Sequence, residues 1–200
     1  LYRLKLSVNL SGNLDILKKV LGSSEDVITR KFVFGGDEQI SAALIYLDGM
    51  VDKATVNESI MRPLMYDSSS ILSQDRLSSE YVKRTMLSVG EVKQVTEIYE
   101  VVDSCLSGDT ILLMDGSREA LVISTKGWEN RGVVDPETET IVRGPREGFT
   151  ESLRINTSLL RRKIKNPGFT IETMTIGRQT KTSVCLAYIK GVAEPELIEE

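Results

Sequence analysis

The pattern of apolar and polar positions predicts a chain of short helices and β-hairpins. Leucines three or four residues apart predict a helix over residues 9–21. Residues 27–34 alternate and are rich in β-branched and aromatic side chains, which predicts a strand. A glycine-rich turn joins this strand to a more continuously apolar one over residues 40–47, so the two are expected to form a hairpin.

The central part of the chain predicts more elements of the same kinds. After Gly49 a helix is expected from near Asp52 to Pro63 or just beyond, and residues 66–79, rich in serine and aspartate, are expected to be a loop or mobile segment. Beyond them the pattern predicts a helix over 80–87, a short strand over 92–95, a helix over 97–106, a hairpin of strands 110–114 and 120–124, and a polar connection over 126–138.

The chain also repeats part of this pattern. A shift of 142 positions without gaps places four residues of the first hairpin on identical residues, namely Gly35 on Gly177, Leu44 on Leu186, Tyr46 on Tyr188 and Gly49 on Gly191. Each copy predicts a strand, a turn, an apolar strand and a helix, the second helix beginning near Pro195. We therefore predict an α/β fold with two related small subdomains and mixed sheets, over residues 1–142 and 143–200, the second an incomplete copy of the first.

Residues 143–165 place a tight turn directly before a basic amphipathic helix. Gly144-Pro145 and Gly148 suit a turn, Thr150 and Glu151 suit a helix N-terminus, and Pro167 is expected to end the helix at about residue 166. Leucine and isoleucine side chains form one stripe of this helix, and a neighbouring row is cationic: Arg154, Arg161 and Lys165. One side of the helix is expected to pack and the other to be cationic.

This segment resembles the signature of the A subunit of GerA-type spore germinant receptors, in which Gly-Pro-Arg-Glu-Gly-Phe leads into a helix carrying Asn and a Leu-x-Arg-Arg tail. The matching positions are Gly144, Pro145, Arg146, Glu147, Gly148, Phe149, Asn156, Leu159, Arg161 and Arg162. Residues 46–52 (YLDGMVD), 107–116 (SGDTILLMDG) and 176–200 agree as well. The resemblance implies two halves similar to solute-binding folds, followed by membrane helices in the rest of such a protein.

Composition limits the chemistry that the chain can perform. The chain has no histidine, which excludes Ser-His-Asp and Cys-His catalysis and the common zinc sites, so we expect no enzyme, no catalytic residues, no metal and no cofactor. Cys105 and Cys185 lie in apolar contexts and are expected to be reduced. No apolar run approaches the roughly 18 residues of a membrane helix, and no apolar signal segment opens the chain, so we expect a soluble piece on the cytoplasmic (spore core) side.

Charge is distributed unevenly along the chain. Residues 1–142 carry 15 basic and 22 acidic side chains, a balance of −7, whereas residues 143–200 carry 10 and 7, a balance of +3. A local cationic patch on an acidic protein favours an acidic partner surface or anionic lipid headgroups over nucleic acid. A solvated helix face explains the same pattern equally well.

Seven residues in or beside the signature are candidates for ligand or partner binding, each with a structural alternative. Arg143, Arg146 and Glu147 surround the Gly-Pro turn, where the two guanidiniums frame an anion or a partner's carboxylate. The alternative, which we favour, is that Arg146 and Glu147 tie the turn to the helix or to the other subdomain. Phe149 is expected to pack beneath the turn, with ligand stacking as the alternative. Asn156 is expected to be partly buried and hydrogen-bonded to backbone. Arg161 and Arg162 contact a partner subunit or headgroups, or they lie on a solvated face.

Two functions from different classes remain open at this point. The resemblance implies a non-enzymatic module of a nutrient receptor in the spore inner membrane, which assembles with B and C subunits and transmits signals during germination. Further A subunits are candidate partners as well. The alternative is a module that binds a small nutrient directly in a cleft between the two subdomains. Residues 177–183 (GRQTKTS) lack the spacing of a phosphate-binding loop and are expected to be a hairpin turn.

Overall fold

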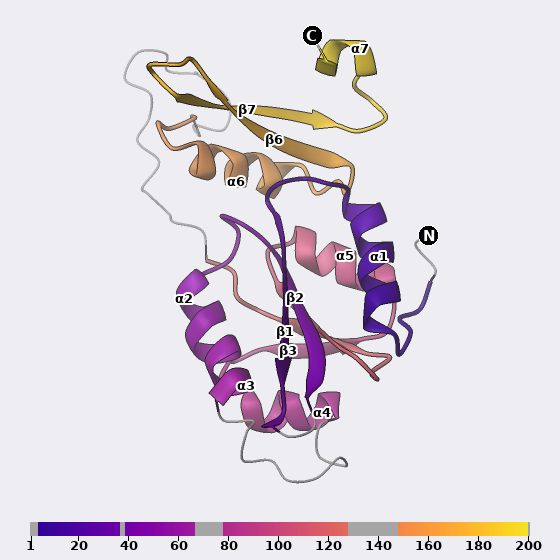
Figure 1. Cartoon of the computed structure of the whole chain (residues 1–200). Coiled ribbons are helices and arrows are strands. Elements are labelled where there is room, and N and C mark those ends of the chain that lie inside the picture. The colour runs from indigo at the N-terminus through magenta and orange to yellow at the C-terminus, as the bar shows by residue number, and fades with distance from the viewer. Residues whose placement is uncertain (1–3, 37–38, 67–77, 128–147, 200) are drawn as a thin grey trace, which may run out of the picture.

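The computed structural model describes residues 4–36, 39–66, 78–127 and 148–199. In these residues a five-stranded sheet carries helices on both faces, and a separate two-stranded sheet lies on a helix beyond one end of it (Figure 1). Arg143, Arg146 and Glu147, and most of the two long polar connections, lie outside the described residues. The predicted α/β class is confirmed.

The five-stranded sheet has the order β1-β2-β4-β5-β3. Its strands are β1 (Val27–Phe34), β2 (Ile40–Leu47), β3 (Val92–Val95), β4 (Thr110–Met114) and β5 (Ala120–Ile123). Every ladder between these strands is antiparallel, so the expectation of mixed sheets is wrong for the described strands. For β1–β2 and β4–β5 the reason is local, because a short hairpin connection can join only antiparallel neighbours. The ladders β2–β4 and β3–β5 join strands that are not consecutive in the chain, so their direction is set by the fold.

Two hydrophobic clusters lie on opposite faces of this sheet. One face packs against α1 (Leu10–Leu21) and α5 (Ile98–Leu106). The other packs against a helical segment made of α2 (Lys53–Thr55), η2 (Val56–Met61) and α3 (Arg62–Tyr66), together with α4 (Ser79–Tyr81) and η5 (Val82–Met86). From Ala42 to Leu47, strand β2 has no residue with a charged or amide side chain, because its successive side chains enter the two clusters alternately.

The remaining elements continue the chain above this layer. They are α6 (Leu153–Lys163), β6 (Phe169–Ile176), β7 (Thr182–Ile189) and α7 (Pro195–Glu199). Strands β6 and β7 form an antiparallel hairpin, so the expected turn over residues 177–183 is confirmed. The hairpin lies over α6, and α6 lies between the hairpin and the rest of the molecule (Figure 1).

The predicted repeat is visible in the backbone. The offset of 142 carries the pair Thr29–Ile45 of β1–β2 onto the pair Ile171–Ala187 of β6–β7, so both hairpins have the same register. Gly49 and Gly191 follow the second strand of each copy and take left-handed φ angles of 81° and 84°. Helices α2 and α7 begin at equivalent positions.

The structure extends the repeat to the helix before each hairpin. In α1, Asn13 Oδ1 accepts from the N–H of Ser7 (2.9 Å) and its Nδ2 donates to the Ser7 carbonyl (2.7 Å). In α6, Asn156 makes the same two bonds with Thr150, each 2.7 Å long. This relation has an offset of 143, one residue more than the hairpins, so a comparison without gaps misses it. We call α1-β1-β2-α2 the first unit and α6-β6-β7-α7 the second unit.

Candidate functional site

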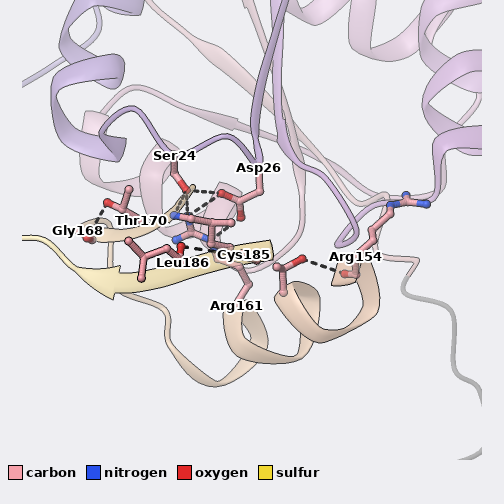
Figure 2. Close-up of polar contacts among 10 residues, drawn as sticks. Ser24, Asp26, Arg154, Arg161, Gly168, Thr170, Cys185 and Leu186 are labelled. Carbon is pink, nitrogen blue, oxygen red and sulfur yellow. Dashed lines mark hydrogen bonds and ion pairs between the residues drawn. The ribbon is translucent and has the colours of Figure 1, made fainter. Parts of the chain in front are cut away.

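A buried ion pair joins the second unit to the first. Arg161 on α6 is only 1% exposed, and its Nε and Nη2 donate to the two carboxylate oxygens of Asp26 at 2.6 and 2.9 Å (Figure 2). Nη2 also donates to Ser24 Oγ at 2.9 Å, and Ser24 Oγ donates to Asp26 Oδ1 at 2.5 Å. A guanidinium can contact both oxygens of one carboxylate in this forked geometry, which a lysine ammonium cannot reproduce.

The segment that carries Asp26 also pairs with the edge of β6. Ser24 Oγ accepts from the N–H of Ile171 at 2.8 Å, and the N–H of Glu25 donates to the Ile171 carbonyl at 3.0 Å. The N–H of Thr173 donates to Glu25 Oε2 at 3.0 Å. Residues 24–26, between α1 and β1, thus fill a groove between α6 and β6, where the guanidinium also lies over the ring of Phe169, 4.8 Å from its centre.

The cationic row predicted on α6 contacts the rest of the molecule, but only Arg161 in it is buried. Arg154 is exposed and its Nη2 lies 3.3 Å from Asp48 Oδ1 of the first unit, and exposed Lys165 donates from Nζ to Ser107 Oγ, which follows α5, at 3.4 Å. The expectation that Arg161 is on an outer cationic face is wrong. The physical reason is that a carboxylate and a hydroxyl from the first unit meet its charge, so its guanidinium can be buried rather than remain solvated.

A tight contact between α6 and the end of β2 lies beside this ion pair. Gly49 has a φ of +81°, and a Cβ there would approach the Arg154 carbonyl oxygen to 3.3 Å and Ser158 Cβ to 3.2 Å. Both the backbone conformation and the close approach of the helix explain why glycine stands here. The segment YLDGMVD is therefore a docking surface for α6.

Asp48 is the acid of this contact. Its Oδ1 lies 2.8 Å from Lys53 Nζ and 3.3 Å from Arg154 Nη2. Partial burial is the largest single influence and opposes ionisation, but the hydrogen bond from Lys53 and the charges of Arg154 and Lys53 together outweigh it and lower the pKa of Asp48. The carboxylate is therefore ionised at neutral pH and links α2 to α6.

A small cavity of about 220 Å³ opens between α2 and α6. It is lined by Gly49, Val51, Asp52, Lys53, Gly127, Ser152, Arg154, Ile155 and Ser158. Two cations and several polar groups therefore border it, but its volume is below the roughly 300–1,000 Å³ usual for sites that enclose a drug-sized ligand. Within the described residues, no group of three metal-ligating side chains is gathered.

The other sequence-predicted residues have different outcomes. Phe149 is 70% exposed, so the expectation that it packs and anchors the helix start is wrong; the bonds between Asn156 and Thr150 fix the helix start instead. The expected backbone hydrogen bonding of half-buried Asn156 is confirmed. Arg162 is half-buried, and its binding role stays a prediction, as do the roles of Arg143, Arg146 and Glu147.

Sequence reasoning missed Ser24, Asp26 and Asp48. A signal that points to Asp26 is an acid directly before the strand of residues 27–34. The thiol of Cys105 is buried, and burial raises its pKa to about 12, so it remains protonated. Cys185 is a free, half-buried cysteine.

Comparisons with known proteins show which family this chain resembles. The profile of the family described as Bacillus/Clostridium GerA spore germination protein matches residues 15–200. The chain is 37% identical over 195 residues to spore germination protein KA of Bacillus subtilis and 33% identical over 197 residues to spore germination protein B1 of the same species. The two matches include 98% of this chain, but they span only 35% and 40% of the length of those relatives.

A solved structure shares the fold. The crystal structure of the N-terminal domain of the A subunit of the Bacillus megaterium spore germinant receptor GerK3 matches with a TM-score of 0.76 and 30% identity. The match covers 98% of this chain and 71% of that one. None of the helices in the described part of the chain is long and apolar enough to cross a bilayer.

Proposed function

Because the chain belongs to the GerA family of spore germination proteins, we propose that it is a non-enzymatic module of a germinant receptor A subunit, which contributes to assembly and signal transmission. One observation carries this proposal: Arg161, a residue of the family signature, joins the two repeated units through a buried ion pair with Asp26. Arg161 and Asn156 belong to that signature, and each fixes a structural contact of α6.

Two kinds of contact between the units suit a mechanical role. The Arg161–Asp26 pair is buried, so separating it leaves an uncompensated charge in the interior and costs several kcal/mol, commonly about 3–5. The Arg154–Asp48–Lys53 contact is partly exposed and is worth less than about 1 kcal/mol. In this mechanism the first contact holds α6 to the first unit, and the second rearranges when ligand state changes elsewhere in the receptor.

Germination assays with the intact receptor in spores test this mechanism. Arg154→Ala leaves the buried pair intact and removes the exposed contact, so the protein should accumulate normally while germination slows. Arg62→Ala is the matched control, because it removes an exposed arginine whose ion pair with Glu58 lies within its own helical segment. Normal germination of the Arg154→Ala spores at normal receptor level would contradict the proposal.

The division of the chain is also part of this proposal. In the first unit, side chains such as Phe34 and Ala42 lie buried under the helices on one face of the hairpin. Their counterparts in the second unit, Ile176 and Val184, are exposed. We propose that residues 143–200 begin a second α/β subdomain whose corresponding face is covered by later residues of the complete protein.

The location and partners of the module follow from the same hypothesis. As part of an A subunit it assembles, in this proposal, with B and C subunits at the spore inner membrane, and contact with other A subunits is a further proposed partner. We propose that this domain faces the spore core. Protease accessibility of an epitope tag placed in residues 67–77, compared between intact and permeabilised membrane vesicles of known orientation, tests the sidedness.

The cavity between α2 and α6 supports a second candidate function, direct nutrient binding. Lys53, Arg154 and Ser152 border it from both units, so a small polar ligand there would contact both. Calorimetry and ligand-observed NMR with amino acids, sugars and nucleosides would show saturable binding that Ser152→Phe removes. Absence of saturable binding to the 200-residue chain would exclude direct nutrient binding and leave only the mechanical role.

A further inference from the structure

A groove on the first unit is the counterpart of the groove that residues 24–26 fill on the second. It lies between α1 and the edge strand β1 and has a volume of about 610 Å³. Its floor is apolar, with Leu17, Leu21 and Ile45, and the turn at residues 22–24 lines it where α1 leads into β1. Charged side chains line it as well: Asp15, Lys18 and Lys31.

Two residues that line this groove are equivalent to residues that hold the segment 24–26 on the second unit. The offset of 143 that relates the helices carries Lys18 onto Arg161, the cation of the filled groove. The offset of 142 that relates the hairpins carries Thr29 onto Ile171, whose backbone pairs with Ser24 and Glu25. The first unit therefore offers a cation at the same place on its helix and a strand edge at the same register.

Occupancy is what distinguishes the two grooves. Between α6 and β6, residues 24–26 supply a carboxylate to the cation and backbone partners to the strand. Between α1 and β1, no described part of the chain pairs with β1 on its outer side. Lys18, Lys31 and Asp15 also form no ion pair with any described residue.

We propose that the groove between α1 and β1 binds an extended acidic segment of a partner protein, in the way that residues 24–26 bind between α6 and β6. The segment adds to the free edge of β1 at Thr29, and a carboxylate one or two residues further on pairs with Lys18. Lys31 lies on the same face of β1 and supplies a second cation for a neighbouring acid. The apolar floor receives one aliphatic side chain of the segment.

Charge complementarity points to a different protein as the source of the segment. The equivalent connection of the second unit, residues 164–168, reads IKNPG and contains no acid. In the first unit, residues 24–26 already pair with Arg161 and β6, so they are not available to a second copy. A partner with an exposed acidic strand or loop fits the site better than another molecule of this chain.

A peptide with the sequence of residues 22–28, GSSEDVI, is the direct probe, because that sequence carries the segment that occupies the homologous groove. Titration into the isotope-labelled 200-residue chain should give saturable NMR shifts of the Thr29 and Lys31 amides. Lys18→Ala should weaken binding about three- to fivefold, as expected for a partly exposed ion pair. Lys19→Ala is the matched control, because Lys19 is adjacent on α1 but does not line the groove.

A charge exchange separates specific pairing from general attraction. Lys18→Glu should lose the peptide and regain binding of GSSEKVI, in which lysine replaces the aspartate. Shifts of Ile171 and Thr173 instead of Thr29 and Lys31 would mean that the peptide displaces the internal segment, which overturns the proposal. Equal binding by the Lys18→Ala and Lys19→Ala variants, or no saturation, overturns it too. Dimerisation that depends on Lys18 would assign the groove to a second copy and overturn the choice of partner.

Discussion

The first and second units have the same plan but are held together differently. In the first, both faces of the hairpin belong to hydrophobic clusters that three further strands extend. In the second, Phe169 and Ile171 are the buried apolar residues among residues 148–199. Phe169 lies under the guanidinium of buried Arg161, and Ile171 donates its N–H to buried Ser24. The comparison shows that one supersecondary motif can be stabilised by a core or by docking on its own duplicate.

The largest effect on the docking of the second unit is expected from a substitution of Asp26. Asp26→Ala leaves the guanidinium of Arg161 buried without its carboxylate, so we expect a loss of about 3–5 kcal/mol in the docking of the second unit. Hydrogen exchange should become fast in α6 and β6 while β2 and β4 stay protected. A double variant, Asp26→Leu with Arg161→Met, should recover most of the loss because no charge remains buried. Unchanged exchange in Asp26→Ala would contradict the assigned role.

Equivalent glycines allow a matched comparison of the two units. Gly49 and Gly191 have nearly the same φ, 81° and 84°, but a Cβ meets Arg154 and Ser158 at Gly49 and nothing within 4 Å at Gly191. The left-handed conformation costs an alanine about 1–2 kcal/mol at either site. We expect Gly49→Ala to cost about 1 kcal/mol more than Gly191→Ala, because the helix α6 must shift. Urea unfolding of both variants measures this, and equal costs would show that α6 does not press on the turn.

The two asparagines that fix the helix starts should differ by a smaller amount. Asn13 is 1% exposed, whereas Asn156 is half-buried, although both make the same pair of backbone bonds. We expect Asn13→Ala to cost about 2 kcal/mol and Asn156→Ala about 1, since unsatisfied backbone groups cost more when water cannot reach them. Thermal unfolding with amide exchange at Ser7 and Thr150 would test the order. A larger loss for Asn156→Ala would reverse it.

The smallest expected effect is the pH dependence of the exposed contact. The folded state lowers the pKa of Asp48, so the stabilisation is present above the unfolded pKa near 4 and is lost as pH falls through the folded pKa. Because Asp48 and its partners are partly exposed, we expect well under 1 kcal/mol. Carboxyl NMR titration gives the pKa of Asp48, and acid unfolding should show a smaller loss of unfolding free energy at low pH in Asp48→Asn than in the wild type. The same loss in the variant and the wild type would exclude the contact as a source of stability.

Much of the fold could be predicted because it depends on local patterns. Periodic leucines predicted α1 and alternation predicted β1, and turns that contain glycine predicted the β1–β2 and β4–β5 hairpins to within a residue of their bounds in the structure. Strand direction in the sheet and the burial of Arg161 could not be predicted. Both depend on which distant surface a face meets, and a cationic stripe has the same sequence pattern whether it is solvated or docked on an acid.

For the candidate site, the sequence therefore indicated some of the residues but not their partners. Asn156 and Arg161 were found from the signature, but their roles depend on partners elsewhere in the chain: Thr150 lies close by, whereas Asp26 precedes Arg161 by more than a hundred residues. Phe149 was expected to anchor the helix start because aromatic side chains are usually buried. Its side chain is exposed, and hydrogen bonds between Asn156 and Thr150 fix the helix start instead.

By itself, the sequence determined the elements, the hairpin repeat, the family and the absence of histidine chemistry, because each follows from residue types at short spacing. Only the tertiary structure decided that the first unit's loop fills the second unit's groove while the first unit's own groove stays open. The physical reason is that burial and charge pairing depend on which surfaces come into contact, and that is fixed by the folded chain as a whole.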